Sequence, residues 1–203
     1  MTGGQAMNQL RLAVVMLILV AAPTCAQNQE GVPVIKIFQE GSSIKFAVKA
    51  SVPIEGNFEK WDATITYPST DAEAGTLEVK IQADSVHTGS GMKDGKLKSK
   101  DFFDTSEDPY ITFKSTKFVQ TGPDTVEVQG IFTIRGVSRP EKLSFGLTGK
   151  GTGVGEIKGT MAFDRKEYGM NSGIPFIKIA DRVEVNVDLK GKRVSGPPLV
   201  FKQ

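Results

Sequence analysis

Cysteine, histidine and tryptophan are nearly missing from this chain, since its 203 residues contain one of each. A zinc site needs several Cys, His or carboxylate ligands at close spacing, and His87 alone does not supply them. Only local serines such as Ser85 and Ser90 lie near His87 in the sequence, which is a weak basis for a nucleophile and its base. Phosphate-cradling and dinucleotide-binding glycine motifs are also missing. The sequence therefore predicts no enzyme, no metal and no cofactor, and it places His87 on the surface or in a turn.

The chain also lacks a large excess of charge, with 25 Lys and Arg against 23 Asp and Glu. A nucleic-acid surface needs a concentrated basic patch, so no nucleic-acid partner is expected. The longest apolar run covers residues 12–22 and follows Arg11. A membrane-spanning helix needs about 20 such residues, so this run is too short to be one.

The apolar run is typical of a signal peptide, because small and polar residues follow it. Thr24 and Ala26 predict cleavage after Ala26, and Met1 or Met7 serves as the start. Cleavage removes Cys25, the only cysteine, and with it any disulfide. Two alternatives are an uncleaved anchor and a lipoprotein acylated at Cys25. The expected organisation is a signal peptide (1–26), an N-terminal segment (27–39), a barrel domain (40–191) and a C-terminal tail (192–203), in a periplasmic or secreted protein.

Apolar and polar residues alternate through most of the remaining chain, as in half-buried β-strands whose side chains point to opposite faces. The alternation predicts eight strands, around residues 44–48, 58–65, 77–81, 111–113, 126–134, 143–147, 157–163 and 183–189. Turn-forming residues separate them at fairly even spacing, which indicates an all-β sandwich or barrel. Residues 85–108 form a long stretch without strand-like alternation, and a short helix is expected there near residues 92–100. Without longer helical patterns between strands, a parallel α/β sheet is not expected.

Eight antiparallel strands close into a barrel whose interior holds side chains or one small ligand. The inward-facing set is large and apolar: Phe46, Val48, Leu77, Val79, Phe113, Phe132, Phe145, Met161, Phe163 and Val185. A packed core and a lined cavity share this pattern, so the pattern leaves both open. An outer-membrane barrel is disfavoured, because the strands are short and the chain has few tyrosines and tryptophans for aromatic girdles.

Several blocks of sequence resemble the YceI-like family in order and in spacing. They are Lys96–Asp104, Pro109–Thr116, Val128–Pro140, Phe163–Met170 and Val183–Leu189, and residues 43–58 resemble the opening of the family. The resemblance covers nearly all of residues 40–190. It implies an extended eight-stranded antiparallel barrel, similar to a lipocalin and exported to the bacterial periplasm. Family members hold a polyisoprenoid, an isoprenoid quinone or a fatty-acid-like chain.

The resemblance favours a lined cavity over a packed core, and we add Phe58, Phe103 and Met170 to the expected lining. Unbranched thioethers such as those of Met161 and Met170 adapt to an irregular chain. Lys96, in a lysine-rich run, and Arg165 are candidate contacts for a lipid head group, although solvated lysines and an ion pair of Arg165 with Asp164 explain them equally. The family often has other residues where His87, Lys93 and Lys96 stand, so head-group specificity is expected to differ.

The function expected is a carrier of an isoprenoid or other long-chain lipid. The alternative is a packed-core barrel that acts in the envelope as an interaction or stress protein without a bound ligand. Transient membrane contact and a homodimer are left open.

Overall fold

The computed structural model describes residues 31–173 and 177–203. The expected signal peptide (1–26), the cleavage site after Ala26 and the acylation alternative at Cys25 lie outside the described residues. None of the helices in the described part is both long enough and apolar enough to cross a membrane.

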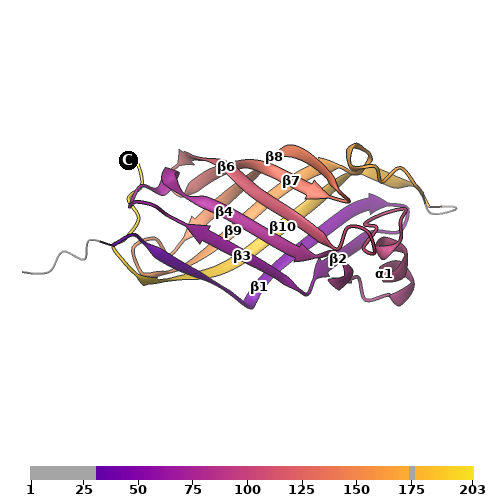
Figure 1. The fold of residues 1–203 in the computed structure, drawn as a ribbon, viewed down its shortest axis with the longest axis horizontal. Coiled ribbons are helices and arrows are strands. Elements are labelled where there is room, and N and C mark those ends of the chain that lie inside the picture. Colours follow the sequence, from indigo (N-terminus) through magenta and orange to yellow (C-terminus); the bar gives the residue numbers. More distant parts are fainter. Residues whose placement is uncertain (1–30, 174–176) are drawn as a thin grey trace, which may run out of the picture.

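The described chain is built almost entirely of strands (Figure 1). The strands are β1 (Val34–Ala50), β2 (Ile54–Phe58), β3 (Trp61–Thr66), β4 (Thr76–Gln82), β5 (Val86–His87), β6 (Tyr110–Gly122), β7 (Thr125–Ile134), β8 (Val137–Thr148), β9 (Val154–Asp164) and β10 (Ile179–Ser195). The helices are α1 (Gly91–Lys98) and three short 3-10 turns, η1 (Ala72–Ala74), η2 (Ala83–Ser85) and η3 (Arg165–Tyr168). Seven of the eight strands expected from the alternation are present as single strands, and the one expected over residues 58–65 is broken at residues 59–60 into β2 and β3. Helix α1 lies where a short helix was expected.

The sheet closes on itself, because β1 pairs with β10 as well as with β2 and β3. β2 and β3 together occupy one position in the wall: Ile54 pairs with Val48 near one end of β1, and Thr66 pairs with Val34 at the other. The named strands pair antiparallel throughout, and β5 adds only a short pairing with β2. The predicted closed, eight-stranded antiparallel barrel is therefore confirmed.

The barrel hydrogen bonding extends further than the range 40–191 expected from the sequence. β1 begins at Val34 and β10 ends at Ser195, and these two residues pair. A register shift between Phe38 and Ser43 breaks the alternation in β1, which hides its first half from pattern analysis. Gly191 has no side chain to mark the inward face of β10 there.

The two ends of the barrel differ (Figure 1). Helix α1 covers one end, called the helix end here, and buries Leu97, Phe102 and Phe103 beneath it. At the other end, called the tail end, β10 leads into the C-terminal residues. This tail is held in place, because the Val200 amide donates to the Thr70 carbonyl at 2.7 Å.

Candidate functional site in the barrel interior

The helix end of the barrel encloses an apolar cavity of about 70 Å³. Inward residues of several strands line it, together with three residues beneath α1: Ile44, Phe46, Val48, Ile54, Phe58, Ile81, Leu97, Phe102, Phe103, Ile111, Phe132, Ile134, Phe163, Arg165, Met170, Ile179, Val183 and Val185. Phe46, Phe58 and Phe103 form an aromatic cluster with ring centroids 5.6–6.3 Å apart. Arg165 is the one polar residue in this lining.

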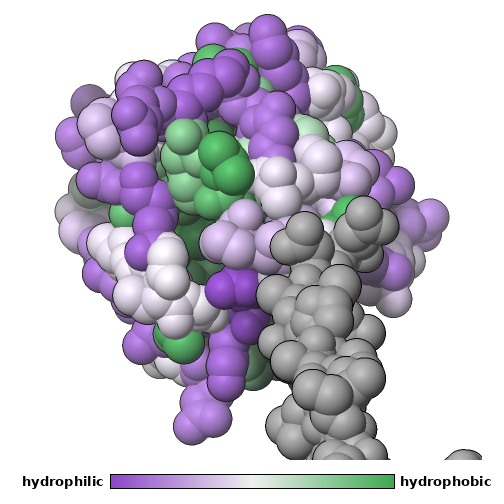
Figure 2. All heavy atoms as spheres, turned by 90° about the vertical axis from the view of Figure 1, so that its left-hand side faces the viewer, coloured by the Kyte–Doolittle hydropathy of each residue, from purple (hydrophilic) through white to green (hydrophobic). Residues whose placement is uncertain are grey.

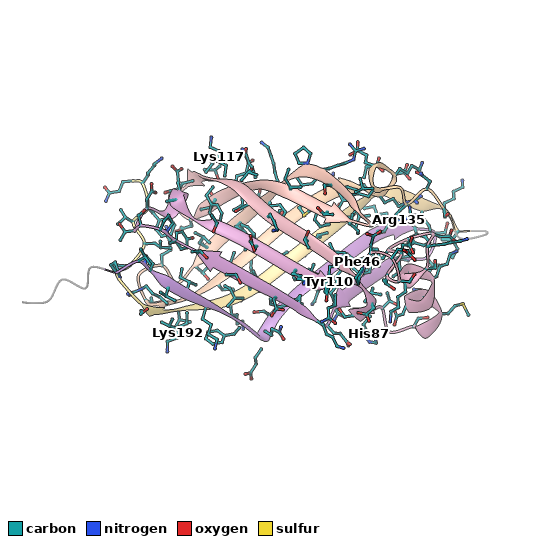
Figure 3. All side chains as sticks on the ribbon, viewed as in Figure 1. Phe46, His87, Tyr110, Lys117, Arg135 and Lys192 are labelled. Atoms are coloured by element: carbon teal, nitrogen blue, oxygen red, sulfur yellow. The ribbon has the colours of Figure 1, made fainter. Side chains whose placement is uncertain are left out.

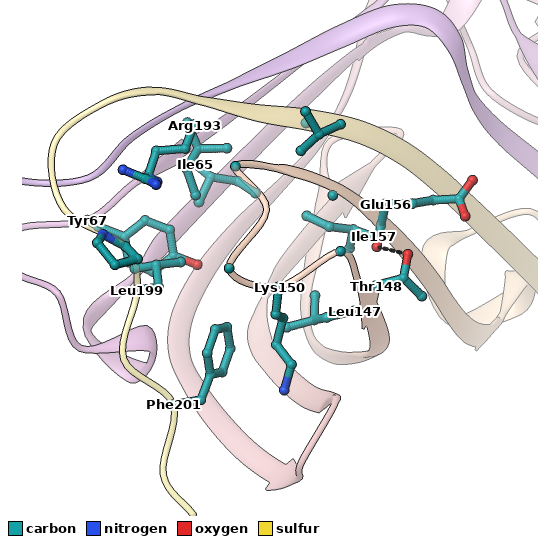
Figure 4. A pocket seen from close by; sticks show the side chains of 18 residues that line it. Ile65, Tyr67, Leu147, Thr148, Lys150, Glu156, Ile157, Arg193, Leu199 and Phe201 are labelled. Carbon is teal, nitrogen blue, oxygen red and sulfur yellow. Dashed lines mark hydrogen bonds between the residues drawn. The ribbon is translucent and has the colours of Figure 1, made fainter.

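The tail end holds a second cavity of about 130 Å³, with a smaller one of about 30 Å³ beside it (Figure 4). Ile65, Tyr67 and Leu147 line both, and Phe201 from the C-terminal tail also reaches both. Burial raises the pKa of Tyr67 to about 12, so this phenol is neutral at physiological pH and is able to donate a hydrogen bond.

A layer of inward side chains lies between the two ends and lines none of these three cavities. We call it the middle layer, and its members on successive strands are Ile37, Ala63, Val79, Phe113, Val128, Leu143, Met161 and Val187. On β1, β4, β6, β7, β9 and β10 the middle-layer residue lies between a helix-end lining residue and a tail-end lining residue of the same strand. The interior is thus two separate apolar spaces rather than one continuous channel.

The structure places every expected lining residue inside the barrel, in one of these three zones. Eight line the helix-end cavity: Phe46, Val48, Phe58, Phe103, Phe132, Phe163, Met170 and Val185. Val79, Phe113 and Met161 belong to the middle layer, and Leu77 and Phe145 line the smaller tail-end cavity. Whether these residues contact a ligand stays a prediction.

Inward glycines, among them Gly159 and Gly56, let phenylalanine rings lie flat along the barrel wall. Gly159 sits directly across from Phe145, and a Cβ at Gly159 would lie 2.3 Å from that ring. Gly56 sits across from Phe46, and a Cβ there would lie 2.8 Å from the ring. Because both rings rest on a backbone without a side chain, they cover the wall instead of crossing the interior.

The two candidate head-group residues share one hydrogen-bonded network at the helix end. The Lys96 ammonium donates to Asp101 at 2.6 Å, and the Ser172 hydroxyl donates to the same carboxylate at 3.2 Å. These bonds hold the pKa of the Asp101 carboxyl below its usual range. Arg165 joins the network by donating to the Ser172 carbonyl at 3.0 Å.

Arg165 is buried and braces the chain on both sides of residues 174–176. Its guanidinium donates to the carbonyls of Met170 and Ala180, and it pairs with Asp181 at 3.2 Å. The ion pair is with Asp181 rather than with Asp164, which instead accepts a hydrogen bond from the Lys166 amide at the start of η3. These bonds tie η3 to residues 170–172 and to the start of β10.

A second arginine, missed by the sequence reasoning, ties three segments of the helix end together (Figure 3). Arg135 lies in the turn between β7 and β8 at a positive φ of 56°. Its guanidinium donates to the Lys100 carbonyl at 2.7 Å and to the Gly169 carbonyl. The sequence feature that could have identified Arg135 is the Arg-Gly turn within residues 128–140.

The lining of the larger tail-end cavity was also missed, because most of it lies outside the strands read from the alternation. Ile35 belongs to the hidden half of β1, and Leu199 and Phe201 belong to the tail. Their apolar character was the available signal, but apolar residues in a terminal segment give no indication of what they contact.

His87 lies on the surface, as expected, with its ring 3.6 Å from the Asp94 carboxylate and half of its side chain exposed. Hydrogen bonds from Thr88 hold the pKa of the Asp94 carboxyl low. Across residues 31–173 and 177–203, no group of three or more His, Cys, Asp or Glu residues could hold a metal ion.

Comparison with known proteins relates this barrel to one family. The model of the YceI-like domain matches residues 36–191. A UPF0312 protein of Pseudomonas savastanoi is 33% identical over 98 residues, which are 48% of this chain and 51% of the relative. Protein YceI of Escherichia coli O157:H7 is 34% identical over 96 residues, or 47% of this chain and 50% of the relative. The chain spans about half the length of these curated relatives.

Solved structures share the fold. BcnA of Burkholderia cenocepacia superposes with a TM-score of 0.69 at 23% identity, over 76% of this chain and 99% of BcnA. A polyisoprenoid binding domain from Saccharophagus degradans superposes with a TM-score of 0.62 at 14% identity, over 79% of this chain and 99% of that domain. At these identities the likeness concerns the fold alone.

Proposed function

This chain belongs to the YceI-like family, and from that premise we propose that its barrel binds one long apolar lipid and carries it through the periplasm. A polyisoprenoid, an isoprenoid quinone or a fatty-acid-like chain fits the proposal. The Saccharophagus degradans domain, described as polyisoprenoid-binding, supports this choice because it shares the fold.

The apolar lining of the helix-end cavity carries the proposal. Of its lining residues only Arg165 is polar, and the guanidinium of Arg165 is already bonded to three carbonyls and to Asp181. Such a lining gives a polar substrate little to bind, whereas burial of apolar surface is worth about 25 cal/mol per Å². Binding of an apolar chain, rather than catalysis, is the activity these side chains favour.

A lipid longer than one cavity has to pass the middle layer. Met161 is the adaptable member of that layer, because its unbranched side chain changes rotamer easily. Phe113 already lies over the backbone of Gly130. We propose that a bound chain displaces Met161 and joins the helix-end and tail-end spaces.

The polar end of the lipid is assigned to the tail end. There Tyr67 offers a neutral phenol beside the cavity, and Lys150 and Arg193 lie in the same lining. A head group at Lys96 or Arg165 would instead have to replace their present partners in the closed network.

A second candidate function is favoured by the middle layer, which separates the helix-end space from the tail-end space. If the middle layer does not move, the barrel is a packed scaffold that acts through its surface in the envelope. The two functions differ in one observable, which is uptake of lipid into the barrel.

The test is native mass spectrometry of residues 27–203 purified gently from the periplasm of the host, followed by organic extraction. Val185→Phe fills the helix-end cavity from β10. Glu184→Phe places the same ring on the outer face, one residue away, and serves as the matched control.

We expect an extractable prenyl or acyl mass on the unmodified chain and on the Glu184→Phe variant, and much less on Val185→Phe. A bare protein mass that does not change when prenyl lipids are offered would reject the carrier and favour the packed scaffold. Equal lipid on both variants would place the ligand outside this cavity.

A further inference from the structure

The tail end of the barrel carries an unusual surface, which we call the valine rim. It comprises five valines that are each 44–61% exposed: Val32, Val34, Val154, Val194 and Val200. Figure 2 views this end directly and shows apolar residues gathered about a hollow, with polar residues around them. Isolated exposed valines are ordinary, but a group around the opening of an apolar cavity indicates an interaction surface.

The valines belong to one continuous edge. Val34 pairs with Ser195 and with Thr66, and Gly196 lies against the Val32 carbonyl. Val154 pairs with Lys192 on the neighbouring strand. Val200 lies across the same end, because its carbonyl accepts from the Ala72 amide at 3.1 Å. The valines at this opening therefore come from four segments: the start of β1, the start of β9, the end of β10 and the C-terminal tail.

Cationic side chains are interleaved with these valines. Lys36 and Lys192 lie directly across from each other on β1 and β10, and Arg193 follows Lys192. Like charges placed opposite each other across strands are destabilising. Among the described residues, none of these three cations has a carboxylate within 4.0 Å, whereas Lys150 and Lys202 pair with Asp124 and Glu73.

The first residue of β1 lies at this same end. β1 begins at Val34, only a few residues after the expected cleavage site at Ala26 and after Cys25. Any attachment through the leader or through an acylated Cys25 would turn the valine rim toward the membrane.

We propose that the valine rim docks the barrel on an anionic lipid bilayer, with the valines at the level of the acyl boundary and Lys36, Lys192 and Arg193 on the head groups. Exposed apolar residues combined with unpaired lysines suit such a surface, because each basic residue near it adds attraction. Most of the rim lies outside residues 36–191, which match the family model. The inference rests on the proposed function only in that docking would bring the tail-end cavity to the lipid.

Residues 27–203 retain every strand of the barrel and contain no cysteine. A single cysteine therefore carries an environment-sensitive dye at a chosen site. Val154→Cys places the dye in the rim, and Val52→Cys, an equally exposed valine near the helix end, is the matched control. Each labelled protein is mixed with vesicles of phosphatidylglycerol and phosphatidylethanolamine in equal parts, and with vesicles of phosphatidylcholine alone.

We expect a blue shift at Val154→Cys with anionic vesicles only, lost at high salt, and no shift at Val52→Cys. In co-flotation of the unlabelled chain, the double variant Lys36→Gln with Lys192→Gln should lower the vesicle partition coefficient by roughly tenfold or more. The double variant Lys93→Gln with Lys100→Gln, at the helix end, should leave it unchanged. Circular dichroism of every variant checks that the barrel is folded.

Failure to float with anionic vesicles would overturn the proposal, as would equal shifts at both dyes or equal losses from both lysine pairs. Uptake of a polyprenol measured without vesicles separates the two proposals. Docking without uptake would reject the carrier and keep the docking surface, and uptake without docking would do the reverse.

Discussion

Truncation of Met161 tests whether a lipid crosses the middle layer. Met161 is 8% exposed and lies on β9 across from Val185 of the helix-end cavity. Replacement of a buried methionine by alanine typically costs about 2–5 kcal/mol, because it removes apolar contacts and leaves a space. We expect Met161→Ala to lower the free energy of unfolding of the empty barrel by this amount.

The same variant should lose less when a lipid is bound. If the chain passes the middle layer, it fills the space left by the methionine side chain. Two or three methylenes placed there return about 1.5–2.5 kcal/mol, at roughly 0.8 kcal/mol each. The cost of Met161→Ala should therefore be smaller in the polyprenol-bound protein by about that amount.

Urea unfolding followed by tryptophan fluorescence measures both costs, since Trp61 is the only tryptophan and is 5% exposed. Val86→Ala is the matched control, because Val86 is buried on β5 and lines none of the interior cavities. Its cost should be the same with and without lipid. If Met161→Ala costs the same in the empty and bound proteins, the lipid does not cross the middle layer and the reasoning fails.

Three further perturbations follow from the described contacts. Gly159→Ala should destabilise the barrel by about 1–3 kcal/mol, because the added Cβ pushes the Phe145 ring inward. Gly146→Ala should not, because its Cβ would meet nothing closer than 3.9 Å. Thermal unfolding of the two variants compares these costs. Arg165→Ala should cost about 2–4 kcal/mol in urea unfolding, because buried carbonyls lose a charged donor, and Arg165→Lys should not restore the loss. Hydrogen bonds from Lys202 and a backbone amide lower the pKa of the Glu73 carboxyl. The bond between ionised Glu73 and Lys202 of the C-terminal tail is therefore fully formed above the ordinary glutamate pKa of about 4.3, and it is lost as the pH falls through the lowered pKa. Protection factors of the tail amides from hydrogen exchange should fall in acid, and unchanged protection factors would exclude the ion pair as the contact that holds the tail.

Alternation along the sequence was enough to predict eight half-buried strands in a sandwich or a barrel, for a physical reason, and the family resemblance favoured the barrel. A closed wall with an apolar inside and a wet outside requires period-two patterning on every strand, and that pattern is visible without any tertiary contact. The same parity placed Phe46, Phe132 and Phe163 inside. Binary pattern fails where the register shifts, as between Phe38 and Ser43, because a bulge exchanges the two faces.

Only the tertiary structure decided how the interior is divided and how its ends are finished. Whether an inward side chain crosses the lumen depends on the residue across from it, as Gly159 allows Phe145 to lie flat. Whether a buried arginine faces a ligand or braces a loop depends on carbonyls brought to it from distant segments, as around Arg165. The valine rim arises in the same way, because four segments meet at one end of the barrel. These features depend on contacts between residues far apart in the chain, and a local pattern carries no information about such contacts.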